Sequence, residues 1–242
     1  VDVTSSYAVF GVMGPASRRL LSRLTRADLV DFPFATSREI DLGYATVRAT
    51  RMTYVGELGW ELYVPTEFAA GVHEDLLAAG ADLGVRQAGY YAIDSLRLEK
   101  GYRAFGRELT PDYGPVEAGL LFACKLRTDV DFLGRAAVEA VRASGPRRRL
   151  VSFALTDPDL MPWGGELVLR DGAPAGQVMS AAWGATVGAG VGLAYVWDPD
   201  GGVVDRDGVL AASYQVDVGG TRCPITVSLR PLVDPEGAAT RT

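Results

Sequence analysis

The stretch Arg51-Met-Thr-Tyr-Val-Gly-Glu-Leu-Gly-Trp-Glu-Leu-Tyr63 decides how the first part of this chain folds. Its centre, Gly56-Glu-Leu-Gly59, predicts the turn of a hairpin, and the residues from Trp60 to Val64 predict the returning strand. Successive side chains of a strand point to opposite faces of its sheet. We therefore expect Trp60 and Leu62 to face a core and Glu61 to point the other way.

Helices and strands alternate through the first 144 residues. Pro15 suits the first turn of a helix, Thr66 is a candidate N-cap, and Gly101 is a typical helix end. The expected strands cover residues 7–13, 40–54 and 60–64, and the expected helices cover residues 14–24, 66–80, 91–100 and 132–141. This alternation predicts a mixed α/β domain.

The segment Ser144-Gly-Pro-Arg-Arg-Arg149 predicts a domain boundary. Beyond it, short strands are expected over residues 150–155, 166–170, 176–180, 191–196, 215–218 and 226–229, with Asp171-Gly172 as a hairpin turn. Such a series of short strands is typical of a small all-β barrel or sandwich. We predict an α+β protein with an interleaved α/β domain, residues 1–144, and a β-barrel domain, residues 145–242. Residues 235–242 are predicted to form a loose tail.

The composition excludes several classes of function. The 242 residues are 48% hydrophobic and 22% charged, which is typical of a globular chain with a sizeable core. The net charge of −6, without a long basic cluster, argues against nucleic acid as a partner. No apolar run approaches the ~20 residues that a membrane span needs. We expect neither a nucleic-acid partner nor a membrane partner.

Histidine and cysteine, which often catalyse reactions or bind metals, are scarce in this chain. His73 is the only histidine, and it lies at the edge of an apolar helix face, so we expect an ordinary packed or solvated side chain. Cys124 and Cys223 are far apart and show no metal-ligand spacing. We therefore predict no metal site. Free thiols suit a reducing compartment, and we expect a cytoplasmic location.

The pattern Tyr-x-Gly-Glu-x-Gly-(aromatic)-Glu from Tyr54 to Glu61, followed by Leu98-Glu-Lys-Gly-Tyr102, resembles the folate-binding module of the glycine-cleavage aminomethyltransferases. The resemblance covers nearly the whole chain and includes two motifs of the C-terminal barrel, 162–165 and 180–184. Many aminomethyltransferases have Ala-Arg-Asp where this chain reads Ala92-Ile-Asp94. This departure favours the variant fused to dimethylglycine and sarcosine dehydrogenases.

Three residues are the candidate folate contacts. A pterin presents a ring N–H beside an amino group, and the Glu61 carboxylate is suited to accept both hydrogen bonds. By strand alternation alone, a solvated surface residue is the favoured role of Glu61, and the resemblance reverses this preference. The resemblance implies that Glu61 and Tyr54 line the folate pocket and that Tyr102 is another lining residue, with a core aromatic as its alternative.

Charged residues recur around the end of the predicted helix 91–100. Asp94 and Arg97 are three residues apart and are expected to pair. Four cations lie at spacings of three or four residues: Arg97, Lys100, Arg103 and Arg107. We interpret them as an ordinary charged surface, with attraction of the glutamyl tail of folate as the alternative.

The resemblance implies capture of a one-carbon unit from a small amine-derived substrate as 5,10-methylenetetrahydrofolate. The aspartate that positions the reacting folate nitrogen in the family precedes the part matched here, so we name no catalytic residue. The chain is either a piece of a longer protein or a reduced module that does not catalyse alone. FAD would bind a separate or missing segment of a flavin dehydrogenase.

Two other functions stay open. One is a stand-alone glycine-cleavage aminomethyltransferase that takes its aminomethyl group from a lipoyl carrier protein. The other is a non-enzymatic folate-binding or interaction module.

Overall fold

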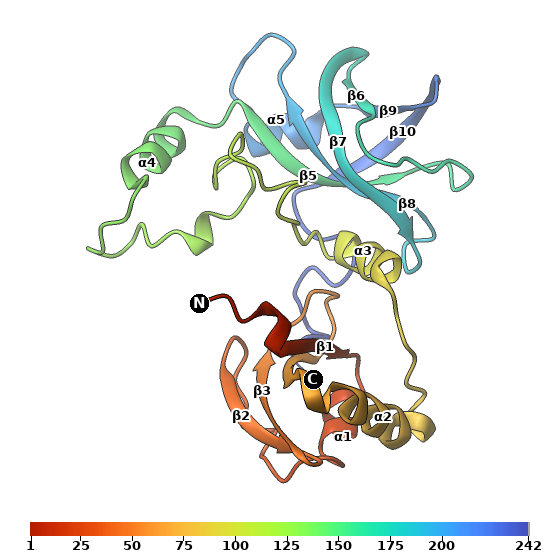
Figure 1. The fold of residues 1–242 in the computed structure, drawn as a ribbon. Coiled ribbons are helices and arrows are strands. Elements are labelled where there is room, and N and C mark those ends of the chain that lie inside the picture. Colours follow the sequence, from red (N-terminus) through yellow and green to blue (C-terminus); the bar gives the residue numbers. More distant parts are fainter. Residues whose placement is uncertain (242) are drawn as a thin grey trace. The chain divides into compact units, whose positions relative to one another are not determined.

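The chain packs as two compact units in the computed structural model, which describes residues 1–241 (Figure 1). The first unit comprises Val1–Ile93 together with the segment from Glu236 to Arg241, and the second comprises Asp94–Pro235. Helix α3 (Tyr90–Glu99) carries the chain from one unit to the next. The domain boundary at residue 144 stays a prediction.

The first unit is a four-stranded antiparallel sheet with two α-helices on one face. The sheet order is β1-β4-β3-β2. Its elements are β1 (Tyr7–Met13), α1 (Ser17–Leu21), β2 (Ser37–Leu42), β3 (Ala45–Arg51), β4 (Gly59–Pro65) and α2 (Ala69–Gly80), with 3₁₀ turns at Thr4–Ser6, Thr66–Phe68 and Ala81–Leu83. Trp60 and Leu62 are completely buried between the sheet and the helices, so the predicted core face of β4 is confirmed.

Three expectations for this unit need correction. The strand predicted over residues 40–54 is a hairpin of β2 and β3, because Gly43 turns the chain with a φ of 60°. Helix α1 is shorter than expected and begins at Ser17. Thr66 does not cap α2: its hydroxyl donates to the carbonyl of Ser5 at 2.8 Å, and a 3₁₀ turn precedes the helix.

The C-terminal segment is part of the first unit and not the loose tail that its composition predicts. Arg51, which is buried, donates from Nη1 to the carbonyl of Phe32 at 2.8 Å and from Nη2 to the carbonyl of Thr240 at 3.2 Å. These two hydrogen bonds partly satisfy a buried cation whose Nε has no hydrogen-bond partner and which has no ion-pair partner among the described residues. The last residues before Thr242 therefore belong to the packed structure.

The second unit is built on a closed six-stranded barrel, ordered β10-β5-β8-β7-β6-β9. The barrel confirms the all-β character predicted for the C-terminal part. Its elements are the 3₁₀ turn Leu121–Ala123, α4 (Arg135–Ser144), β5 (Arg148–Leu155), β6 (Leu167–Arg170), β7 (Ala173–Gly184), β8 (Ala189–Trp197), α5 (Arg206–Ala211), β9 (Tyr214–Val218) and β10 (Thr221–Ser228). Helix α5 was not expected; Asp205 caps it by accepting the N–H of Gly208 at 2.7 Å.

Two turns of the barrel show why glycine stands where it does. Asp171 and Gly172 join β6 to β7 with φ angles of 51° and 87°, which confirms the predicted hairpin turn. Gly188, with a φ of 75°, belongs to the turn between β7 and β8. Gly190 and Gly192, which follow it, lie within β8.

The two faces of the sheet in the first unit predict opposite mutational effects. Leu62→Ala removes side-chain volume from the buried face and should lower the free energy of unfolding by about 2–5 kcal/mol. Val9→Ala, on the other face where the Val9 side chain is 53% exposed, should change it by only about 0.5 kcal/mol. Chemical denaturation of both variants measures the difference, and equal effects would contradict the face assignment.

Candidate functional site

The outer face of the four-stranded sheet carries the principal candidate, Glu61. Glu61 and Tyr63 are half-buried on the face of β4 opposite the core. The Tyr63 hydroxyl donates to Oε2 of Glu61 at 3.1 Å. Burial raises the pKa of Tyr63, and the hydrogen bond to Glu61 raises it further, so the phenol stays a proton donor at neutral pH.

The strand register defines the neighbours of Glu61. Gly11 of β1 lies directly opposite Glu61 on one side, and Thr50 of β3 lies opposite on the other side. Among the described residues, Glu61 has no ion-pair partner. Its carboxylate therefore presents acceptor capacity that no cation occupies, on a sheet face that the helices of its own unit do not cover.

Tyr54 lies in the connection between β3 and β4 and is half-buried. This connection is ordered by Thr53, whose hydroxyl oxygen accepts backbone N–H groups of Val55 at 3.3 Å, Gly56 at 3.0 Å and Glu57 at 3.2 Å. Tyr54 and Glu61 thus belong to the same unit and to the two sides of one hairpin. Glu57, at the tip, is tied to the turn through its backbone N–H.

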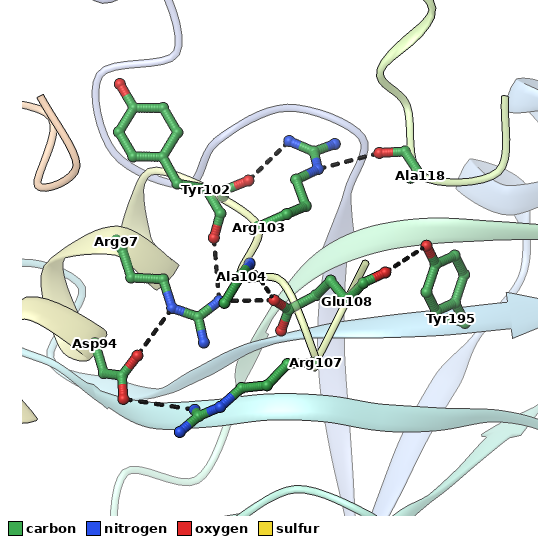
Figure 2. A network of polar contacts seen from close by, with 10 residues as sticks. Asp94, Arg97, Tyr102, Arg103, Ala104, Arg107, Glu108, Ala118 and Tyr195 are labelled. Carbon is green, nitrogen blue, oxygen red and sulfur yellow. Dashed lines mark hydrogen bonds and ion pairs between the residues drawn. The ribbon is translucent and has the colours of Figure 1, made fainter. Parts of the chain in front are cut away.

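Tyr102 belongs to the second unit and follows the end of α3. Gly101 ends the helix with a φ of 62°, and the N–H of Tyr102 returns to the carbonyl of Arg97 at 2.8 Å, as the predicted glycine end requires. Burial raises the pKa of Tyr102, and nearby Asp234 adds to the effect. Figure 2 shows its ring pointing away from the polar network that holds its backbone.

That network centres on a fully buried ion pair between Arg97 and Glu108. Both side chains are 0% exposed, and Nη1 of Arg97 lies 3.0 Å from Oε2 of Glu108. Arg97 also donates to the carbonyl of Tyr102 at 3.0 Å and to Asp94 at 3.1 Å, which confirms the expected Asp94–Arg97 pair. Oε2 of Glu108 accepts the N–H of Ala104 at 2.8 Å. The pair thereby fixes the loop that begins at Tyr102 (Figure 2).

Two further charges at the end of α3 are also buried. Glu99 accepts the N–H groups of Thr186 at 2.7 Å and Val187 at 3.0 Å, and so fastens the turn between β7 and β8. Lys100 is paired with Asp234 at 2.9 Å. The predicted charged surface is therefore wrong for Arg97 and Lys100, because each has a specific carboxylate partner that allows burial.

Sequence reasoning missed Glu99 and Glu108 as structural residues. Their partners lie far along the chain for Glu99 and across a loop for Glu108. Spacing alone does not reveal such pairs.

The other candidates have ordinary environments. His73 is half-buried against Phe10, with ring centroids 5.8 Å apart. Within residues 1–241, no cluster of three His, Cys, Asp or Glu side chains is placed to hold a metal ion. Over the same range, no helix is both long and apolar enough to cross a bilayer. Trp163 and Trp183, in the two barrel motifs, are exposed and do not pack into a core.

Two family models match most of the chain. Residues 1–128 match the GCVT N-terminal domain, and residues 148–234 match the glycine cleavage T-protein C-terminal barrel domain. The crystal structure of glycine cleavage system aminomethyltransferase T from Bartonella henselae has the same fold, with a TM-score of 0.65 at 19% sequence identity, over 96% of this chain and 85% of that one. The α+β assignment and the C-terminal barrel agree with these matches.

Curated relatives include both dehydrogenases and a transferase. Human mitochondrial sarcosine dehydrogenase is 41% identical over 97% of this chain and 26% of its own length. Mitochondrial dimethylglycine dehydrogenase of Rattus norvegicus is 36% identical over 99% of this chain and 27% of its own. An aminomethyltransferase of Geobacillus kaustophilus is 36% identical over 91% of this chain and 59% of its own. The chain spans about a quarter of the length of the two dehydrogenases.

The buried pair predicts a strong and non-additive effect on stability. Glu108→Leu leaves the buried Arg97 cation with only the partly exposed Asp94 as an ion-pair partner and should lower the free energy of unfolding by about 3–5 kcal/mol. The double variant Arg97→Met/Glu108→Leu should lose less than the sum of its single variants. Asp82→Ala, which breaks the exposed pair with Arg23, is the matched control and should have a much smaller effect, because exposed ion pairs contribute little to stability. Denaturant titration measures the free energy of unfolding of Arg97→Met, Glu108→Leu, the double variant and Asp82→Ala. Additive losses in the double variant would contradict the coupling.

Proposed function

Because the chain belongs to the glycine cleavage T-protein family, we propose that it binds tetrahydrofolate and captures on it a one-carbon unit from an amine donor. The product is 5,10-methylenetetrahydrofolate. Among its relatives are sarcosine and dimethylglycine dehydrogenases as well as an aminomethyltransferase, which supports an amine-derived donor. The dehydrogenase type is the branch that we favour, since Ile93 stands where many aminomethyltransferases have arginine.

The observation that carries this proposal is the environment of Glu61. A pterin edge offers two adjacent N–H donors, and a carboxylate accepts such a pair in a fork. Glu61 meets this demand because it is half-buried, lacks a cation partner among the described residues, and lies on the sheet face away from the core. A carboxylate that is already paired with an arginine would accept hydrogen bonds from the pterin more weakly.

We propose Tyr54 and Tyr102 as the other folate contacts. The Thr53 hydroxyl orders the turn beside Tyr54, and the Arg97–Glu108 pair orders the loop beside Tyr102, so both aromatic residues project from fixed backbone. Rigid supports of this kind lower the entropy that ligand binding must offset. The task of these residues is to bind and orient the acceptor and to exclude water, because the one-carbon donor is already electrophilic.

Tetrahydrofolate supplies the two nucleophilic nitrogens that hold the one-carbon unit. We propose no catalytic residue within this chain, and oxidation of the donor by FAD belongs to a separate segment or protein. The small amine-derived substrate, a flavin dehydrogenase segment and a lipoyl carrier protein are the candidate partners. A cytoplasmic location stays a prediction, and the two dehydrogenase relatives are mitochondrial by name.

Titration calorimetry with tetrahydrofolate on the complete gene product that contains residues 1–242 tests the proposal. Stoichiometric binding supports it, and the absence of binding refutes it. Methylene transfer from an aminomethylated carrier protein would instead favour a stand-alone aminomethyltransferase.

Glu61→Gln should weaken tetrahydrofolate binding by about 2–4 kcal/mol, or about 30- to 1000-fold, because it turns one acceptor into a donor that faces a donor. Stability should change little, since the core face of β4 is untouched. Glu57→Gln, at the tip of the same hairpin, is the matched control and should change the affinity much less. Equal effects of the two substitutions would identify Glu61 as an ordinary surface residue.

A further inference from the structure

Gly11 is a glycine that neither its backbone nor its packing requires. It lies inside strand β1, its φ is outside the left-handed region, and a Cβ built on it would meet only the terminal methyl of Met13, at 3.4 Å. A glycine inside a strand costs roughly 0.5–1 kcal/mol of stability relative to alanine. A glycine inside a strand often marks a bulge, a bend or the close approach of another molecule, and β1 pairs with β4 without a register shift.

The place that Gly11 leaves open is next to Glu61. The two residues are directly paired across β1 and β4, so their side chains point to the same face. In such a pair, the Cβ atoms stand roughly 4.5–5.5 Å apart. Any side chain at position 11 would therefore stand beside the Glu61 carboxylate, and glycine keeps that position empty.

The walls of this opening are apolar. Val9 and Met13 flank Gly11 on the same face of β1, because residues two apart on a strand share a face. Val9 is exposed, although it is a large hydrophobic residue in a strand. A bare strand surface with apolar neighbours on either side and a carboxylate at one edge suits a flat heterocycle whose N–H groups lie along one edge.

Tyr63 supplies the remaining constraint. Its hydroxyl holds Oε2 of Glu61 at 3.1 Å, and its raised pKa keeps the hydroxyl protonated at neutral pH. The hydrogen bond restricts a side chain that otherwise has three rotatable bonds, and a group locked by a neighbour binds with a smaller entropic loss. Among the described residues, the Tyr63 hydroxyl is the side-chain donor that holds Glu61.

We propose that Gly11 is a specificity-determining residue of the pterin site, and that Tyr63 is the positioning residue for Glu61. Gly11 admits the flat ring against β1, and Tyr63 orients the carboxylate that binds its edge. This inference rests on the proposed folate function and assigns to it two residues outside the Tyr54–Glu61 motif.

The first test measures binding of 5-formyltetrahydrofolate, a stable folate, by calorimetry on the complete gene product. Gly11→Val should weaken binding about 10- to 100-fold, and Gly11→Ala should have a smaller effect in the same direction. Thr46→Val exchanges a branched polar side chain for an apolar one of similar size on the same sheet face, about 13 Å along β3 from the residue opposite Glu61, and should leave the affinity unchanged.

The second test separates positioning from a merely structural role. Tyr63→Phe should weaken binding about 5- to 30-fold in the natural sequence but have almost no effect in a Glu61→Gln background, because its contribution passes through that carboxylate. If Tyr63 had only a structural role, Tyr63→Phe would weaken folate binding equally in both backgrounds. Denaturation of each variant gives its free energy of unfolding, and Gly11→Ala decides the steric question if Gly11→Val does not fold.

The outcomes keep the two proposals distinct. If the natural protein does not bind the folate, the proposed function fails. If it binds and Gly11→Val binds equally well, or Tyr63→Phe acts equally in both backgrounds, only the present inference fails. If Gly11→Ala and Gly11→Val destabilise the complete protein in proportion to side-chain volume, the open face is covered by protein and the ligand assignment is overturned.

Discussion

The buried charges at the end of α3 are the constraint on which the second unit depends. Arg97, Glu99 and Lys100 are almost fully buried, and each is tied to a different segment: the loop around Glu108, the turn at 186–187 and the segment that contains Asp234. A buried charge without a partner is strongly destabilising, so these segments are held to one arrangement. The loop that carries Tyr102 is thereby held in place through its backbone.

In the first unit, strand β4 contributes both to the core and to the opposite face of the sheet. Alternate residues of β4 fill the core, and the intervening ones, Glu61 and Tyr63, stand on the open face. The period of two therefore couples the core to the proposed folate site, because the strand that buries Trp60 also carries Glu61. Gly11, which is paired with Glu61 on the neighbouring strand β1, leaves the space beside this carboxylate free of a side chain. Thr53 orders the backbone of the turn that precedes β4.

The sequence predicts those features whose cause is local. The alternation from Trp60 to Val64, the helix end at Gly101 and the turn at Asp171-Gly172 follow from strand period and from glycine conformations, and the structure agrees. The error over residues 40–54 was also local: Gly43 is a turn residue that the alternation of its neighbours obscured. The burial of Arg97 and Lys100 has distant causes, because their partners Glu108 and Asp234 are identified only by the fold. The same holds for the C-terminal segment, which Arg51 binds from 189 positions away.

A crystal structure of the complete gene product with bound 5-formyltetrahydrofolate tests the central claim most directly. The account predicts the pterin edge within about 2.7–3.2 Å of both carboxylate oxygens of Glu61, as expected for N–H···O hydrogen bonds. It also predicts that the ring lies over Gly11, with Oε2 still bound by Tyr63. A folate bound elsewhere, with Glu61 in contact only with water, would contradict it.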